Sequence, residues 1–328
     1  MSDVKISYLL GAGASANALP TIKKVTDKSD SSKGLSNELK EFVVKESSSF
    51  IFRGYTEFTD KKLIEITENC IEFGTPDLYA KFLLEKSRGS NYELLVRLIS
   101  NYFIYKETVQ YARDKRALAF MTMVADQRKF PSNLSIVSWN YDNQIELAAK
   151  ELKYSTNQPY MENFRVWPND EERSDNPYTF VHINGVSGYK YDTRNLAIQN
   201  KDWRLFDDSI NPLISFSWEI KEGGKYGFLD QRIDLAKKAM KGSSILVIVG
   251  YSFPFFNRKI DNELIEVLRP TLKKIYFQDP FNNGNFLYER FNWLEGGIDG
   301  DLGVMREKSK IPIKHISNCD QYFIPVEL

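Results

Sequence analysis

The chain has 328 residues, of which 42% are hydrophobic and 27% charged, a composition typical of a globular protein. Lys plus Arg and Asp plus Glu both number 44, so there is no basic excess of the kind that nucleic-acid binders carry. The 2 cysteines and 2 histidines are too few for a structural zinc site, and we expect neither a metal nor a disulfide framework. No apolar run approaches the roughly 18 residues of a membrane span, and the N-terminus lacks a basic leader, so we expect a cytoplasmic protein without membrane contact.

The N-terminal part of the chain predicts one strand followed by a long helical segment. Residues 4–10 alternate and are rich in β-forming side chains, and they lead into a glycine turn. The small polar residues of 26–35 predict an exposed loop. From Leu35 to about Gln127 apolar residues recur at helical spacing without a strong strand, which indicates a helical insertion. Its aromatic residues are expected to lie in the core rather than in a cofactor site: Tyr102, Phe103, Tyr105, Tyr111 and Phe120.

After Pro131 the pattern changes to short apolar strands that alternate with helices. Strands are predicted at 134–138, 178–183, 244–249 and 274–277, and helices at 143–152, 228–240 and from the Gly250 loop to about residue 268. Residues 186–227 are loop-rich and aromatic and predict no regular element.

This alternation predicts an α/β fold, with a Rossmann-like parallel sheet, helices on both faces and a helical insertion after the first strand. The expected division is a nucleotide-binding domain of residues 1–25 and 130–328 and an insertion of residues 35–128.

The glycine turn after the first strand is the first candidate site. Gly11, Gly13 and Ala16 match the G-x-G-x-x-G/A pattern. In that pattern the first glycine permits a tight turn, the second lets the backbone approach a pyrophosphate, and the following helix offers N–H groups to the phosphate charge. The alternative is a glycine-rich turn between strand and helix that binds no ligand.

Polar or small residues also follow the other predicted strands. The segments GAGAS, SWNYD, HINGVSG, GYS and QDP each stand at a strand end. Because ligands of parallel sheets bind at the carboxyl ends of the strands, these segments predict a large nucleotide site along one edge.

Within these segments, Asn140, Asp142 and His182 are the residues best suited to chemistry. Asn140 and Asp142 alternate and therefore share a side of an extended chain, where they could orient a carboxamide or a water; alternatively Asn140 caps the following helix. His182 is the best general-base candidate, although a single histidine is often structural. His315 lies in the C-terminal region without supporting context.

Taken together, these motifs resemble a known family. GAGAS-x-x-x-x-P, SWNYD, a strand end that contains histidine, and VGYSFP-x-x-NR-x-ID are similar to the sirtuin-like domains of bacterial anti-phage defence proteins. The resemblance covers the first 20 residues and most of 134–285, whereas the helical stretch matches in position alone. It implies a Rossmann-like domain with a smaller helical module, and hydrolysis of NAD to nicotinamide and ADP-ribose.

The resemblance also assigns roles to residues. Gly11, Ala12, Gly13 and Ser15 would line the phosphate and ribose region, and Asn140 would position the ribose or the attacking water. Asp142 would hold the nicotinamide amide. Gly250 and Ser252 would lie at the adenosine side, and Asp279 near the adenine.

The chain departs from the family pattern in two respects that concern its chemistry. The zinc-binding cysteines of classical sirtuins are missing, which disfavours a protein deacylase. Where the family has histidine directly before glycine, this chain has Asn184 before Gly185, and His182 stands two residues earlier. Period-two geometry predicts that His182 and Asn184 share a face, and we expect His182 to be the base.

The sequence therefore predicts an NAD hydrolase that acts as an anti-phage effector and is gated by a partner protein or by self-assembly, since constant activity would be toxic. The alternatives are a regulatory subunit that binds NAD without turnover, a deacylase and, last, a dehydrogenase.

Overall fold

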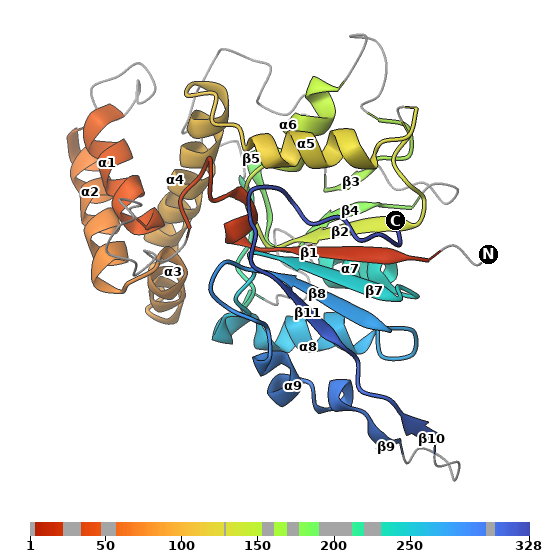
Figure 1. The fold of residues 1–328 in the computed structure, drawn as a ribbon. Helices are drawn as coiled ribbons and strands as arrows, with labels where there is room; N and C mark the ends of the chain where they lie inside the picture. Colours follow the sequence, from red (N-terminus) through yellow and green to blue (C-terminus); the bar gives the residue numbers. More distant parts are fainter. Residues whose placement is uncertain are drawn as a thin grey trace.

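The computed structural model describes residues 4–21, 34–46, 57–127, 129–152, 161–168, 177–189, 212–219, 231–299 and 306–328. Its centre is a seven-stranded sheet in the order β11-β8-β7-β1-β2-β4-β3, in which neighbouring strands pair in parallel (Figure 1). From β1 the chain builds outward to β2 and β4, and it then crosses to β7, β8 and β11 on the other side of β1. The fold is thus Rossmann-like, as the sequence predicts, with the strand order reversing between β1 and β7.

The strands of this sheet are short and mostly fully buried. They are β1 (Ile6–Leu10), β2 (Leu134–Ser138), β3 (Val166–Trp167), β4 (Phe180–His182), β7 (Ile245–Val249), β8 (Lys274–Gln278) and β11 (Ile313–Ile316). Two small antiparallel pairs stand apart from it, formed by β5 (Gly185–Tyr189) with β6 (Pro212–Ile214) and by β9 (Gly297–Asp299) with β10 (Arg306–Lys308). The prediction missed β3, β5, β6, β9, β10 and β11. Its strand at 178–183 is trimmed to three residues.

Helices cover both faces of the sheet, as expected. The helices are α1 (Leu35–Glu46), α2 (Glu57–Glu72), α3 (Pro76–Glu85), α4 (Gly89–Thr108), α5 (Lys115–Val124), α6 (Gln144–Glu151), α7 (Arg232–Met240), α8 (Arg258–Glu266) and α9 (Phe286–Arg290), with 3-10 turns η1 (Ala12–Ser15), η5 (Phe255–Asn257) and η6 (Asn292–Glu295). Residues 228–230 of the predicted 228–240 helix, most of the predicted loop 26–35 and much of 186–227 lie outside the described residues.

Alternation along the strands divides the core between the two faces. Tyr8 and Leu10 belong to one apolar cluster together with residues of α5 and α6, whereas Leu9 belongs to a second cluster with residues of α7 and α8. Because both faces of a central parallel strand are buried, every residue of β1 and β7 is buried, including the polar Ser7.

Helices α1–α4 form a separate bundle with its own apolar cluster, which also takes in Leu19 and Tyr141 from the loops after β1 and β2. Figure 1 shows this bundle beside the end of the sheet where β1 leads into η1. The insertion therefore packs against the carboxyl edge of the sheet, where the candidate site residues lie. Helix α3 begins as its sequence dictates, with Pro76 in the first turn and the Thr75 hydroxyl accepting the Leu78 N–H at 3.3 Å.

Helix α5 does not belong to this bundle. Its buried residues Ala117, Phe120 and Met121 join the cluster on one face of the sheet. Within the segment predicted as the insertion, 35–128, helices α1–α4 thus share one apolar cluster, whereas α5 packs with the sheet. Of the aromatic residues expected in the core, Tyr102, Phe103, Tyr105 and Phe120 are buried, but Tyr111 is 74% exposed because it lies in the segment between α4 and α5.

Candidate functional site

The glycine turn after β1 is packed against the loop after β7. The Gly13 amide donates to the Gly250 carbonyl at 3.0 Å, and the Gly11 amide donates to the Val249 carbonyl at 3.0 Å. A Cβ added at Gly13 would come within 2.7 Å of the Gly250 Cα, and one added at Gly11 would come within 2.6 Å of the Tyr251 Cα. Gly250 itself has φ +57°, a conformation that glycine adopts without strain.

These contacts explain why glycine stands at positions 11, 13 and 250, which the sequence alone does not reveal. They let two loops meet where the strand order reverses, which is where open parallel sheets bind ligands. The turn continues into the four-residue 3-10 turn η1 instead of a long helix, and the Ala14 amide bonds to the Gly11 carbonyl at 2.9 Å. Four amides of the turn (Gly11, Gly13, Ala14 and Ala16) thus donate to protein carbonyls, and they are not free to bind a phosphate in this conformation.

Asn140 and Asp142 reach the glycine turn from the end of β2. The Asn140 Nδ2 donates to the Ser15 Oγ at 3.2 Å, and Ser15 also hydrogen-bonds Asp142. All three side chains are buried. Ser15 thus brings the Asn140 and Asp142 side chains together at the glycine turn. Helix α6 begins at Gln144, so Asn140 does not cap it; instead the Asp142 Oδ1 accepts the Gln144 N–H at 3.2 Å.

The surroundings of Asp142 shift its ionisation. Burial raises the pKa of its carboxyl to about 6, against the opposing effect of the hydrogen bonds from Ser15 and from the Gln144 amide. At neutral pH the group is ionised but able to exchange a proton, which is the property of a general base.

His182 is held in a buried ion pair. It is the last residue of β4, its Nε2 lies 2.6 Å from the Glu146 Oε1, and its Nδ1 lies 3.3 Å from the Asn140 carbonyl oxygen. Burial lowers the pKa of His182, but the charge and hydrogen bond of Glu146 outweigh burial and leave the pKa raised. A carbonyl and a carboxylate both accept, so both ring nitrogens carry protons. The histidine expected as the base therefore has no free lone pair here, and its contacts are those of a positioning residue.

Asn184 lies beyond the strand rather than on it. The chain turns after His182, the last residue of β4, and Gly185 has φ +69°. The Asn184 Nδ2 donates to the Trp139 carbonyl at 3.1 Å. Its buried Oδ1 has no hydrogen-bond partner among the described residues, and the same holds for the Tyr141 hydroxyl. Such buried polar atoms are costly unless a ligand or water satisfies them.

The remaining predicted site residues are less directly placed for chemistry. Ser252 is exposed, and Ala12 is partly buried in η1. The Asp279 Oδ1 accepts the Phe281 and Asn282 amides at 2.9 and 2.7 Å, which is a turn-forming role. His315 is on β11, and its Nε2 lies 2.8 Å from the Asp279 carbonyl.

The YSFP-x-x-NR-x-ID motif forms a buried network that holds the loop after β7. The Tyr251 hydroxyl donates to the Asp261 Oδ1 at 2.8 Å, and the Asn257 Nδ2 donates to the Tyr251 hydroxyl at 2.9 Å. Arg290 donates to the Asp261 Oδ2 at 2.8 Å. By fixing this loop, the network keeps Gly250 against the glycine turn.

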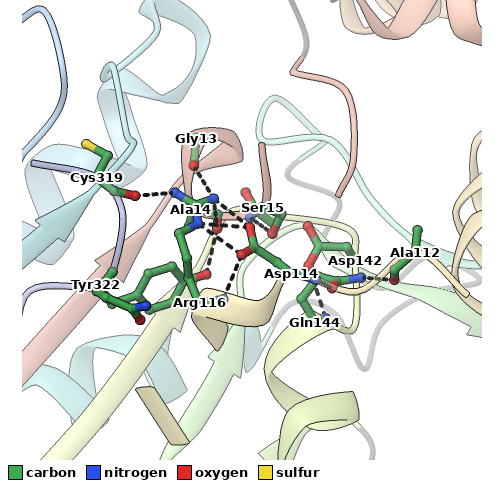
Figure 2. A network of polar contacts seen from close by, with 12 residues as sticks. Gly13, Ala14, Ser15, Ala112, Asp114, Arg116, Asp142, Gln144, Cys319 and Tyr322 are labelled. Carbon is green, nitrogen blue, oxygen red and sulfur yellow. Dashed lines mark hydrogen bonds and ion pairs between the residues drawn. The ribbon is translucent and has the colours of Figure 1, made fainter. Parts of the chain in front are cut away.

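Sequence reasoning missed several residues that surround the site. Figure 2 shows one such group, in which Arg116 and Tyr322 bond to the carbonyls of the glycine turn and Gln144 bonds to the segment before α5. Glu146 was also missed. An acidic residue in the first turn of a helix is common, so nothing in the sequence marks Glu146 as the partner of a histidine on another strand.

Among the described residues, no helix combines the length and the apolar character that crossing a bilayer requires. In the same part of the chain, the His, Cys, Asp and Glu side chains form no group of three able to hold a metal ion. A scan of the chain against protein-family models finds no match, and no curated protein matches it either.

Proposed function

We propose that this chain binds NAD at the carboxyl edge of its sheet and hydrolyses the bond between nicotinamide and ribose. The observation that carries the proposal is the convergence of Asn140 and Asp142 on Ser15, beside the point where the strand order reverses. A nucleotide-sized substrate is the ligand class that this position in a Rossmann-like sheet favours. The unpartnered Asn184 Oδ1 and Tyr141 hydroxyl add groups that a polar ligand could satisfy.

The residue roles follow from their chemistry. The Asn140 amide would orient the ribose or the attacking water, and the resemblance assigns Asp142 to the nicotinamide amide. We extend the role of Asp142, because a buried carboxylate beside the ribose would also stabilise the positive charge of an oxocarbenium-like transition state.

The reaction balances without a cofactor. The bond between C1′ of the ribose and the pyridinium nitrogen breaks, and its electron pair neutralises the departing nicotinamide. The water oxygen bonds to C1′, and one water proton passes to Asp142, whose pKa of about 6 suits it to accept and then release a proton. His182 would support this step indirectly, since its Nδ1 donates to the backbone carbonyl of Asn140.

A specific observation favours one second candidate, a regulatory subunit that binds NAD without turnover. Both nitrogens of His182 are bonded to protein, and the residue before Gly185 is an asparagine, which does not titrate. In this case the edge would bind the nucleotide while Asp142 served only as a hydrogen-bond acceptor.

Nicotinamide release and NAD binding, measured on the purified full chain with and without the product of the neighbouring gene, separate the two candidates. The proposal expects release by the wild-type chain and a loss of about 10²–10⁴-fold in Asp142→Asn, with NAD still bound. Asp126→Asn is the matched control, because this exposed carboxylate lies before the amino end of β2, away from the edge that carries Asp142, and its rate should equal that of the wild type.

Each contrary result has one meaning. Full activity in Asp142→Asn would refute the assignment of the base. Binding without release under any condition would favour the regulatory subunit, and absence of NAD binding would refute both candidates.

We further propose that the activity serves anti-phage defence in the cytoplasm, by depletion of NAD in infected cells, and that a partner protein or self-assembly gates it. The proposal predicts that cellular NAD falls after phage challenge in cells with the wild-type chain and stays constant in cells with Asp142→Asn. An equal fall in both strains would refute this role.

A further inference from the structure

The segment that leaves the helical insertion carries three buried ionisable side chains, those of Glu107, Asp114 and Arg116. It runs from Glu107, in the last turn of α4, to Arg116, in the first turn of α5, and thus joins the insertion to the layer that covers the sheet. Glu107 and Arg116 are 0% and 6% exposed. Each of them bonds to a different loop of the candidate site.

Arg116 holds the glycine turn. Its Nη2 donates to the Ala14 carbonyl at 2.9 Å and more weakly to the Gly13 carbonyl at 3.4 Å, and its Nη1 donates to the Cys319 carbonyl at 3.1 Å (Figure 2). The guanidinium is itself fixed by Asp114, which accepts from its Nε at 2.9 Å. A planar guanidinium can serve these acceptors simultaneously, whereas a lysine ammonium cannot reach them all.

The same segment holds the loop after β2. The Glu107 carboxylate accepts the Asn143 amide at 2.7 Å and the Asn143 Nδ2 at 2.9 Å. The Gln144 side chain accepts the Asp114 amide at 2.7 Å and donates to the Ala112 carbonyl at 3.1 Å. The segment is therefore bonded on one side to the turn that carries Ser15 and on the other to the loop that carries Asp142.

We propose that Arg116 is a positioning residue, and that the segment from Glu107 to Arg116 couples the helical insertion to the site. It sets the distance between Ser15 and the pair Asn140 and Asp142, so that a shift of the insertion moves these side chains together or separates them. The catalytic consequence of this coupling rests on the proposed function; the mechanical coupling does not.

Physical chemistry supports the coupling because the bonds involved are buried. A buried donor or acceptor that loses its partner bears the full cost of desolvation, so the insertion cannot shift while both loops stay in place with their bonds intact. An external partner that binds the insertion would in this way act on the site without touching it.

Amide hydrogen exchange of the ligand-free protein tests the coupling without reference to NAD. Arg116→Met and the conservative Arg116→Lys are compared with Lys115→Met, which removes the neighbouring exposed cation. We expect exchange about tenfold faster in both Arg116 variants at residues 11–16 and also at residues 139–144, with β7 and the control unchanged. Faster exchange confined to residues 11–16 would overturn the proposal, and so would an equal effect of Lys115→Met. If Arg116→Met does not fold, Arg116→Lys decides.

Kinetics give a second readout that a purely structural role would not change. With the concentration of folded protein measured independently, Arg116→Lys should lower kcat for nicotinamide release about tenfold or more while KM stays within about threefold, because misplacement of the reacting groups affects the transition state most. An unchanged kcat would overturn the catalytic part. If the wild-type chain neither binds nor cleaves NAD, the proposed function fails, and the exchange result alone decides the coupling.

Discussion

Replacement of Glu146 by glutamine tests whether His182 is a structural imidazolium or a free base. The carboxylate is the partner that raises the pKa of His182 against the effect of burial. In Glu146→Gln the amide oxygen can still accept from Nε2 but cannot stabilise the positive charge. We therefore expect the variant to contain neutral His182 at pH 7.

The expected magnitude follows from the burial of the pair, whose side chains are 0% and 5% exposed. Disruption of a buried ion pair by loss of one partner costs about 3–5 kcal/mol. At about 2 °C per kcal/mol, the low end of the range for large domains, this loss corresponds to a fall in Tm of about 6–10 °C.

The effect of Glu146→Gln on the free energy of unfolding should depend on pH in one direction. A histidine whose folded pKa is raised contributes stability that is fully present below its unfolded pKa of about 6.5 and is lost as pH rises through the folded value. The difference in unfolding free energy between the wild type and Glu146→Gln should therefore be largest near pH 6 and should shrink at higher pH.

Urea unfolding at several pH values measures this difference, and nitrogen-15 NMR of the imidazole reports its protons directly. Two ring N–H signals in the wild type and one in the variant at pH 7 would agree with the ion pair. A stability difference that stays constant or grows as pH rises would refute it and would return His182 to the position of candidate base.

Three further perturbations test other contacts of the site. Gly250→Ala places a Cβ 2.5 Å from the glycine turn at a residue with positive φ, and should lower the free energy of unfolding in urea by about 2–5 kcal/mol. Gly242→Ala also has a positive φ but open space around the Cβ, and should lower it by about 1–2 kcal/mol. Equal losses would contradict the packing of the two loops. Tyr322→Phe removes a 2.6 Å hydrogen bond to the Ala14 carbonyl. It should lower the free energy of unfolding by about 1 kcal/mol and speed amide exchange in the glycine turn. Unaltered exchange would mean that this bond does not hold the turn. Asp142→Asn removes a carboxyl whose pKa is raised to about 6 by burial. The free energy of unfolding should therefore rise by up to about 3 kcal/mol at pH 8 and change little at pH 4. A variant less stable than the wild type at pH 8 would argue against a burial penalty at this position.

The parts of the fold that the sequence predicts best are those whose signal is local. The runs at 134–138 and 244–249 are apolar because both faces of a central parallel strand are buried, and they match β2 and β7 within one residue. Strands β3 and β11 escape prediction because they are short strands at the two edges of the sheet, with two and four residues, and β11 reads IKHI, without an apolar run. The spacing of apolar residues in α5 shows that the helix has an apolar face, but it does not encode which surface that face packs against. The packing of α5 on the sheet was therefore not predicted.

In the candidate site, too, the features with a local signal are predicted from the sequence, and those that depend on packing are not. The sequence predicts that Asn140 and Asp142 lie at the carboxyl edge of the sheet, because strand ends converge there in any parallel sheet. It does not reveal that Glu146 pairs with His182, because the two are 36 positions apart and meet only through the packing of α6 on the sheet. The glycine turn is ambiguous in sequence for a physical reason: close approach of a phosphate and close approach of another loop both require the absence of a Cβ.

The contacts of His182 and Asn184 bear on which side chain could accept a proton at this edge of the sheet. His182 ends β4 and is tied to α6, so its proton is committed to a contact that supports the backbone of Asn140. Asn184 occupies the turn beyond the strand, where its free oxygen can accept a hydrogen bond but cannot accept a proton. In the proposed reaction the proton is therefore accepted by Asp142, the titratable side chain that bonds to Ser15. Since Asp142 must be ionised to accept a proton, the proposed NAD hydrolysis should decline as pH falls below about 6, in parallel with protonation of that carboxyl.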